Sequence, residues 1–342
     1  MCHLEACIES LFATKTVENI IVKVGRGDEV LCEIAKSAQQ RQLTERTLFD
    51  MASVTKIVAT TSLALIAMDK GLLSPSDPVS RFFSVPEDKT SMTIHHLMTH
   101  TIGIGYKLLT DVPPHNIVDH ILRIPSDIPM GSDVRYSCPG FILLGKILEQ
   151  IYGTRLDVAF QERVAKPLGL KNTCFLPPKG DIINANLTPD MVGVVNDYNC
   201  RHLGGVAGNA GLFSNLSDMT VYAKLLLANG APLFSKALFA EATRNHTEGM
   251  AESRGLGFLY VDGRYSQTGD LFAEGSFGHC GHTGQSVFAD PKSGLYAIVL
   301  SDATVSTAKK YGHERYAEVI AMRRDIHAAI KADLQQKGVL LS

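Results

Sequence analysis

Two pairs of short apolar segments at opposite ends of the 342-residue chain restrict the fold more than any other feature. Residues 20–24 and 30–34 are rich in Ile and Val and are joined by a glycine-containing turn at 25–28, which predicts a β-hairpin. Residues 286–289 and 295–300, joined by a turn at 290–294, predict a second one. The chain between them has a mostly helical pattern. This order predicts one antiparallel sheet assembled from both ends of the sequence.

Helices are expected beside this sheet at both termini. Apolar residues recur at helical spacing from Leu4 to Phe12, and a last helix is predicted over residues 314–336. We therefore predict an α+β fold whose antiparallel sheet is flanked by N- and C-terminal helices and carries an inserted, mostly helical domain. Residues 1–70 and 245–342 are expected to form the discontinuous sheet domain, and residues 71–244 the inserted domain. A catalytic cleft is expected between the two.

Composition limits the partners of the chain. Hydrophobic residues make up 45% and charged residues 20%, which is a globular balance with ample material for a core. The formal net charge is −2, and Lys and Arg are scattered along the chain. This pattern argues against nucleic-acid or membrane binding and favours a small-molecule substrate. The sequence leaves the oligomeric state open.

Several observations favour a cytoplasmic location. The first seven residues contain no basic region followed by an apolar run, so no secretory signal is expected, and no stretch is expected to be long enough to span a bilayer. The seven cysteines are irregularly spaced and include no C-x-x-C pair. We therefore expect reduced thiols rather than disulfides, and neither a metal nor a cofactor.

The segment Ser53-Val54-Thr55-Lys56 is the first chemical signal. It stands at the start of a helix, residues 57–68, that is apolar nearly all round and therefore expected to be buried. A Ser and a Lys three positions apart project from one helix face, so the amine can take the hydroxyl proton. The pair alone is weak evidence, because the same spacing occurs by chance on solvated helices.

Two further segments extend this signal. Tyr136 stands in the run Arg135–Phe141, just before a helix expected to end at Gly153. The second is the glycine-rich run 277–286, Phe-Gly-His-Cys-Gly-His-Thr-Gly-Gln-Ser, which leads into the C-terminal hairpin. Closely spaced glycines there allow a ligand to approach the strand backbone.

In their order along the chain these three segments resemble the motifs of the serine β-lactamase and penicillin-binding protein superfamily, in its class C-like branch. That superfamily carries Ser-x-x-Lys, then Tyr-x-Asn, then Lys-Thr-Gly or His-x-Gly on a strand. Residues 48–56, 92–101 and 203–214 also resemble family stretches. The resemblance runs from about residue 45 to residue 300 and implies the β-lactamase/transpeptidase-like fold.

The resemblance implies a role for each matching residue. Ser53 is the nucleophile, and Lys56 and Tyr136 share the base role, with the proton holder at each step left open. The oxyanion hole consists of the backbone N–H groups of Ser53 and of His282, three positions after the His of the third motif. His279 occupies the motif's first position, and Gly281 and Cys138 are expected in the substrate-binding cleft.

The third motif has two possible registers, beginning at His279 or at His282. Family members reach an Asp-Pro turn eleven positions after the motif His, and Asp290 stands at that interval from His279. We therefore assign His279 to the motif and expect His282 to line the cleft.

Two departures from the family pattern bear on the substrate. Cys138 stands where the family has asparagine, so a side-chain amide is missing. His279 replaces lysine, and imidazole is a weaker and conditional partner for a substrate carboxylate. Both favour an esterase or another acyl hydrolase working through a covalent acyl-enzyme. The alternatives are a β-lactamase, a D-Ala-D-Ala carboxypeptidase or D-aminopeptidase, and a catalytically silent relative that binds a ligand or partner.

Two other patterns have simpler interpretations. His96 and His100 have a spacing that can bind zinc, but no Glu follows His96 and no third ligand is evident, which favours a structural pair. The glycines at 205, 208 and 211 do not have dinucleotide-binding spacing. They predict a tight loop near the cleft.

Overall fold

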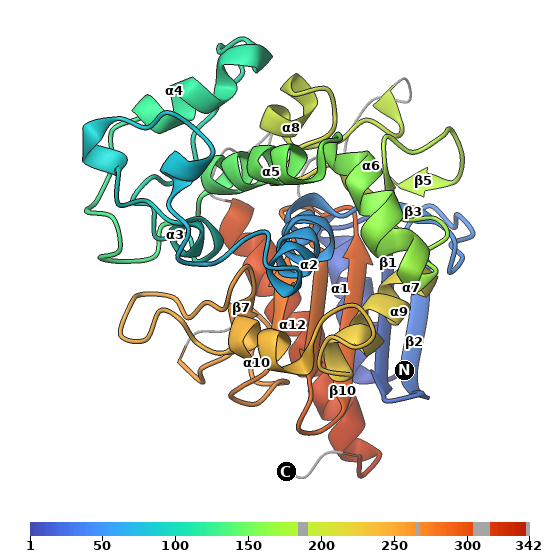
Figure 1. The fold of residues 1–342 in the computed structure, drawn as a ribbon. Coiled ribbons are helices and arrows are strands. Elements are labelled where there is room, and N and C mark those ends of the chain that lie inside the picture. Colours follow the sequence, from blue (N-terminus) through green and yellow to red (C-terminus); the bar gives the residue numbers. More distant parts are fainter. Residues whose placement is uncertain (184–190, 265–266, 304–314, 340–342) are drawn as a thin grey trace.

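The computed structural model describes residues 1–183, 191–264, 267–303 and 315–339, with the side chains of residues 315 and 316 left out. The chain forms an α+β fold built on a six-stranded antiparallel sheet (Figure 1). The strand order is β2-β1-β10-β9-β8-β7, so the N-terminal hairpin joins the C-terminal strands through the β1–β10 pair. In that pair Ile20 lies opposite Ser301 and Arg26 opposite Leu295. The predicted fold, one sheet assembled from both chain ends, is confirmed.

The strands of the two sheets have these bounds: β1 (Asn19–Arg26), β2 (Glu29–Ser37), β3 (Leu48–Asp50), β4 (Cys174–Phe175), β5 (Ile182–Ile183), β6 (Leu212–Ser214), β7 (Leu259–Tyr260), β8 (Phe277–Cys280), β9 (Ser286–Asp290) and β10 (Leu295–Ser301). The α-helices are α1 (His3–Ala13), α2 (Ser62–Asp69), α3 (Ile94–Met98), α4 (Ile117–Arg123), α5 (Cys138–Tyr152), α6 (Leu156–Phe160), α7 (Lys166–Leu168), α8 (Tyr198–His202), α9 (Leu216–Leu227), α10 (Lys236–Thr243) and α12 (Arg315–Gln336). Short 3₁₀ and π turns are η1 (Ala52–Val54), η2 (Lys56–Thr61), η3 (Val79–Arg81), η4 (Glu87–Lys89), η5 (Pro114–Asn116) and η6 (Gln161–Ala165).

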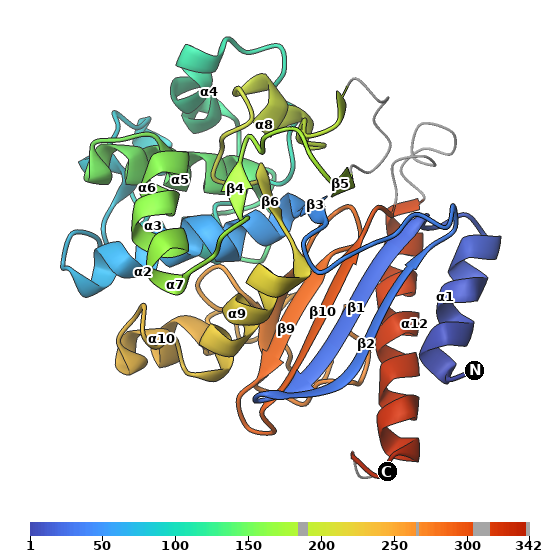
Figure 2. The ribbon, with the colours of Figure 1, turned by 90° about the vertical axis from the view of Figure 1, so that its right-hand side faces the viewer.

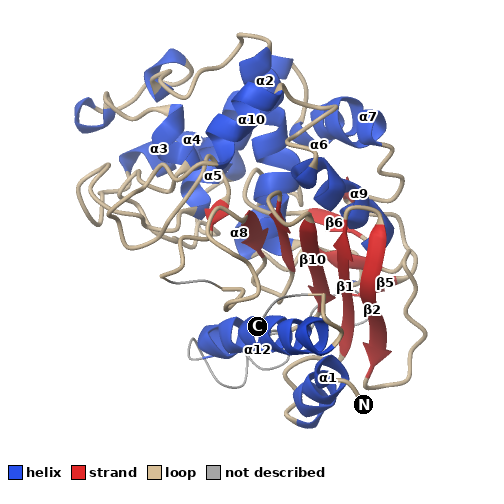
Figure 3. Cartoon of the chain, turned by 90° about the horizontal axis from the view of Figure 1, so that it is seen from below, coloured by secondary structure: helices blue, strands red, loops and turns tan. Residues whose placement is uncertain are grey.

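Helices cover both faces of the large sheet. The terminal helices α1 and α12 lie side by side on one face, as Figures 2 and 3 show, and bury apolar residues against it. On the other face α9 packs on β9 and β10. Helix α9 falls within residues 71–244, so part of the predicted insert rests on the sheet. The domain boundaries at 70/71 and 244/245 stay a prediction, and residue 314, the predicted start of the last helix, lies outside the described residues.

A second, smaller sheet with the order β4-β6-β3-β5 was not expected from the sequence. Its strands are only two or three residues long, too short to show an alternating pattern. Strand β3 ends at Asp50, three residues before Ser53. This sheet therefore holds the chain that enters the Ser53 turn.

The apolar segment Ala52–Asp69 runs through the middle of the molecule. By length and composition alone it could cross a membrane, so the expectation that no stretch is long enough was wrong. However, 83% of this segment is buried inside the fold, and the core helix of a soluble protein passes the same test. It begins with the 3₁₀ turn η1 and continues as a π turn, η2, a form that is frequent at functional sites.

Two glycines set how closely α5 approaches the loop that precedes β6. A Cβ added to Gly208 would lie 2.1 Å from the Phe141 carbonyl oxygen and 3.0 Å from the Gly145 Cα. Backbone atoms cannot give way as a flexible side chain can. We therefore expect Gly208→Ala to lower the free energy of unfolding by about 3 kcal/mol or more, through overpacking.

Urea denaturation measures this change. Gly180→Ala is the matched control, because the nearest atom to its added Cβ is 3.9 Å away. Equal stability of the two variants would contradict the close approach of α5 to this loop.

Candidate active site

A strained turn presents Ser53. Ala52, just before it, has φ of +44°, in the left-handed region that non-glycine residues rarely adopt. The Ala52 N–H donates to Asp50 Oδ1 at 2.8 Å, and Asp50 Oδ2 accepts from the Asn196 N–H at 2.6 Å. Burial raises the pKa of the Asp50 carboxyl to about 6. Asp50 therefore anchors the turn, and Ser53 itself stays partly exposed.

Lys56 lies one helical turn further along and is completely buried. Its Nζ lies 3.0 Å from Ser53 Oγ, 2.8 Å from the carbonyl oxygen of Asn209 and 3.8 Å from Cys138 Sγ. Burial lowers the pKa of the Lys56 ammonium. The lysine is thereby positioned, and shifted toward its neutral form, to accept the hydroxyl proton.

Tyr136 faces this pair from the loop before α5, whose N-cap is Ser137. Its ring centroid is 5.0 Å from Lys56 Nζ. Burial raises the pKa of the phenol well above its ordinary value, while a hydrogen bond with the Ser53 side chain acts in the opposite direction. The structure thus brings Ser53, Lys56 and Tyr136 together from two distant parts of the chain.

Strand β8 contributes His279. Its ring centroid is 6.3 Å from that of Tyr136, and its side chain is buried. Nδ1 lies 2.8 Å from the Cys280 carbonyl, which only accepts, so Nδ1 carries a proton. Burial lowers the pKa of His279 well below its usual range, and the charges of Arg254 and Lys56 lower it further. His279 is therefore neutral near pH 7.

Gly281 and His282 follow the end of β8. A Cβ on Gly281 would lie 2.9 Å from the Met51 carbonyl oxygen, so only glycine lets the strand approach the Ser53 turn this closely. Arg323 Nη1, from α12, donates to the Gly281 carbonyl at 3.0 Å. In a trans peptide the next N–H points the opposite way, so the His282 N–H points away from Arg323. Its role in an oxyanion hole, with the Ser53 N–H, stays a prediction.

The two histidines of the ambiguous motif differ in position. The His279 side chain faces Tyr136, whereas that of His282 is exposed. Cys138, at the start of α5, is buried with its Sγ directed at Lys56 Nζ. Burial raises the pKa of this thiol, which keeps it uncharged.

Comparison with known proteins identifies the family of this chain. The family model described as Beta-lactamase matches residues 4–321. The chain belongs to the beta-lactamase family. It is thus a member of the serine β-lactamase and penicillin-binding protein superfamily of serine hydrolases, as its motifs predicted.

Proteins that are similar to this chain carry several activities in their names. A protein of Escherichia coli K12 named "Putative D-alanyl-D-alanine carboxypeptidase" is 30% identical over 77% of this chain and 71% of its own length. A class C beta lactamase from Rhodobacter sphaeroides has the same fold, with a TM-score of 0.72, 19% identity, and coverage of 96% of this chain and 99% of its own. EstCE1, "a hydrolase with promiscuous acyltransferase activity", aligns with a TM-score of 0.70 and 22% identity over 95% and 97% of the two chains.

Three residues around Lys56 and Tyr136 were not identified from the sequence as site residues. Asn209 supplies the carbonyl that binds Lys56 Nζ, from the glycine-rich loop expected near the cleft. Arg254 lies with its guanidinium carbon 5.5 Å from the Tyr136 ring centroid. His100 lies 4.7 Å from the same ring, centroid to centroid. The glycines around Asn209 predicted a loop near the cleft, and the spacing of His100 from His96 indicated a structural pair, whereas the single Arg254 gave no signal.

His96 and His100 have separate roles in this member of the family. His96 Nδ1 lies 2.8 Å from Thr93 Oγ1 and belongs to the capping box of α3. His100 Nδ1 accepts from the Ser137 N–H at 2.9 Å, next to Tyr136. Among the described residues, no group of three or more His, Cys, Asp or Glu side chains is arranged to hold a metal ion.

Proposed function

We propose that this protein is a serine acyl hydrolase that works through a covalent acyl-enzyme and prefers carboxylic esters. The observation that carries the proposal is the 3.0 Å contact between Ser53 Oγ and the buried Lys56 Nζ, with Tyr136 against both. A serine hydroxyl is a weak nucleophile until a base lies beside it. Here two bases are within reach.

The reaction follows from these contacts. Ser53 Oγ gives its proton to the Lys56–Tyr136 pair and attacks the acyl carbonyl carbon. The resulting oxyanion accepts hydrogen bonds from the backbone N–H groups of Ser53 and His282, and the pair returns the proton to the leaving alcohol or amine. The same pair then takes a proton from water, which attacks the acyl-enzyme, and returns it to Ser53 Oγ as the bond between Oγ and the acyl carbon breaks and the acid leaves.

The preference for esters rests on Cys138 and His279. A thiol is a weak hydrogen-bond donor and cannot replace the amide that would contact a substrate acylamide. His279 is neutral, so it offers no positive charge to the carboxylate of a β-lactam. An ester with a small uncharged acyl group needs neither contact.

Peptide hydrolysis is the second candidate. Two Escherichia coli relatives are named "Putative D-alanyl-D-alanine carboxypeptidase", which favours peptide hydrolysis over β-lactam hydrolysis. A D-Ala-D-Ala peptide therefore belongs in the same substrate screen. Release of D-alanine faster than ester hydrolysis would replace the ester preference with this activity.

A fluorophosphonate probe tests the acyl-enzyme itself, because it phosphonylates only an activated serine. Peptide mapping after labelling should place the adduct on Ser53. An unlabelled protein, or an adduct on another serine, would contradict the proposed function.

Turnover of two chromogenic substrates tests the ester preference. We expect kcat/KM for a short-chain p-nitrophenyl ester to exceed that for a chromogenic cephalosporin by about tenfold, the value of one lost hydrogen bond. Cys138→Asn, which supplies the missing amide, should lower the ratio of kcat/KM for the ester to kcat/KM for the cephalosporin. The matched variant Cys138→Ala should leave this ratio unchanged. Faster cephalosporin turnover by the unaltered protein would contradict the preference.

We further propose a cytoplasmic location. All seven cysteines are free thiols, and Cys138, Cys200 and Cys280 are buried. Reduced cysteines are typical of compartments that keep thiols reduced.

A further inference from the structure

Arg254 is a buried arginine at the edge of the proposed catalytic site. Its side chain is only 2% exposed. Glu252 Oε2 accepts from its Nε at 3.0 Å and from its Nη2 at 2.5 Å, while its Nη1 is buried without a hydrogen-bond partner. Burying a permanent cation and leaving one of its N–H donors without a hydrogen bond costs free energy, so the burial of this guanidinium requires an explanation.

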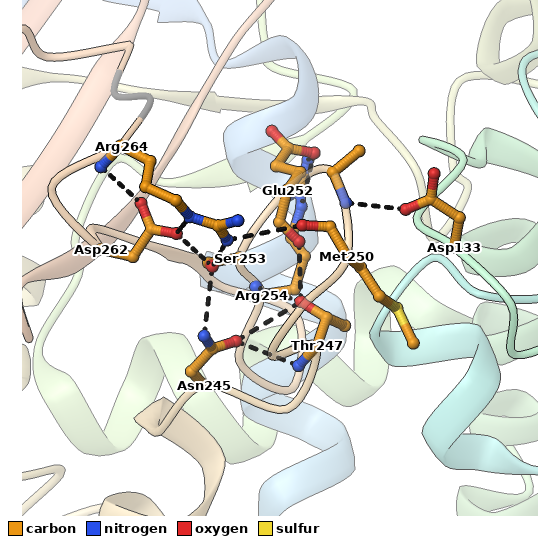
Figure 4. Close-up of polar contacts among 10 residues, drawn as sticks. Asp133, Asn245, Thr247, Met250, Glu252, Ser253, Arg254, Asp262 and Arg264 are labelled. Carbon is orange, nitrogen blue, oxygen red and sulfur yellow. Dashed lines mark hydrogen bonds and ion pairs between the residues drawn. The ribbon is translucent and has the colours of Figure 1, made fainter.

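The loop around Arg254 fixes its position firmly. Thr247 Oγ1 accepts from the Arg254 N–H at 2.9 Å and donates to the Glu252 carbonyl at 2.7 Å. Asp133 Oδ1 accepts from the N–H of Ala251 at 2.8 Å, which ties the loop to the segment before Tyr136. Figure 4 shows these contacts converging on the loop. Arg254 is therefore held in place rather than free to change rotamer.

The Tyr136 ring lies close to this charge. The Arg254 guanidinium carbon lies 5.5 Å from the ring centroid, and Lys56 Nζ lies 5.0 Å from it. A cation near an aromatic face is attracted by the ring, and the attraction grows when the phenol becomes a phenolate. Arg254 and Lys56 thus approach the same tyrosine ring.

We propose that Arg254 is a positioning residue whose fixed positive charge keeps the Lys56–Tyr136 pair ready to accept the Ser53 proton. This inference rests on the proposed function and adds a fixed positive charge beside the Lys56–Tyr136 base. Arginine suits the task because its guanidinium remains protonated at any pH at which the protein is folded. Lys56 cannot supply this constant charge, since it exchanges protons during the reaction.

The other groups around the pair do not duplicate this charge. Arg254 lowers the pKa values of both Tyr136 and Lys56, which favours the deprotonated form of each. His100 and His279 are neutral, because burial lowers their pKa values well below the usual range. Asp197 acts in the opposite direction to Arg254. The groups that face the pair are Ser53, His100, Cys138, Asp197, Arg254 and His279.

The pH dependence of ester hydrolysis tests the inference. With an uncharged p-nitrophenyl ester, Arg254→Met should shift the acidic limb of the kcat/KM profile upward by about one to two pH units, the effect expected of a charge at this distance. Activity lost at neutral pH should return at alkaline pH, and Arg254→Lys should restore most of the profile. Arg254→Gln removes the charge but can still donate to Glu252, and it replaces Arg254→Met if that variant does not fold.

The control is Arg264→Met, on the segment that follows β7. Arg264 pairs with Asp262 at 2.6 Å and its side chain is 56% exposed, so this variant should leave the profile in place. Ultraviolet titration of tyrosinate, with a Tyr136→Phe spectrum subtracted, should show Tyr136 ionising at higher pH in Arg254→Met.

Three results would overturn the inference: an unshifted profile, an equal loss at every pH, or an unchanged Tyr136 titration. A role of Arg254 in binding a substrate carboxylate would also leave the profile for an uncharged ester unshifted. Failure of the proposed function is distinguishable, because the unaltered protein would then show no fluorophosphonate label on Ser53.

Discussion

Replacing Ser53 with alanine should lower kcat/KM for an ester by on the order of a millionfold, the typical cost of removing a serine hydrolase's nucleophile. The attacking atom must lie beside Lys56 Nζ, and Ser53 Oγ does so at 3.0 Å. Steady-state hydrolysis of a p-nitrophenyl ester measures the loss. Fluorophosphonate labelling should disappear in parallel.

The stability of this variant should stay close to that of the unaltered protein. Ser53 is partly exposed, so its hydroxyl contributes little packing. Ser76→Ala is the control, since Ser76 lies on an exposed loop and pairs with Ser74. An Ser53→Ala variant that is folded and still hydrolyses the ester at a comparable rate would show that the nucleophile is misassigned.

Replacing Lys56 with methionine should lower kcat/KM by about 10²–10⁴, the range for loss of a general base. Methionine keeps the length and apolar character of the lysine stem but cannot take the Ser53 proton. The loss is smaller than for Ser53 because the Tyr136 phenol still lies next to the hydroxyl. A variant with undiminished activity would mean that Tyr136 alone is the base.

The Lys56→Met variant also tests whether the pKa of the buried amine is lowered, because that shift makes the free energy of unfolding depend on pH. Burial lowers the pKa of Lys56 in the folded protein below its ordinary value of 10.5. Between these two pKa values the unfolded chain binds a proton that the folded protein does not, so the stability that Lys56 contributes rises with pH. Relative to Lys56→Met, the unaltered protein should gain unfolding free energy as pH increases toward 10.5 and gain nothing above it.

Urea unfolding of both proteins over a series of pH values measures this difference. Taking the difference in unfolding free energy between the two proteins cancels the contributions of the titratable groups that they share. A difference that stays constant, or falls with rising pH, would mean that the buried amine keeps its ordinary pKa.

Much of this molecule follows from local sequence. The hairpins at residues 20–34 and 286–300 have strong β patterns, and the all-round apolar helix after Lys56 can only be buried, so the sheet and its central helix were predictable. The helix that begins at Cys138 ends at Gly153, where φ is +64°, as a glycine C-cap predicts. The Ser53–Lys56 pair was also predictable, because helix geometry alone brings residues three apart together.

Other features depend on contacts between distant segments. Arg254 reaches the Tyr136 ring from more than a hundred residues away, and its neighbours in sequence give no sign of this contact. The same holds for the Asn209 carbonyl on Lys56 and for the paired strands β3 and β6, which are too short to show a period. Local propensity and periodicity describe a residue's own element. They determined the sheet, the buried helix and the Ser-Lys pair, whereas the charges around that pair were decided only by how the elements pack.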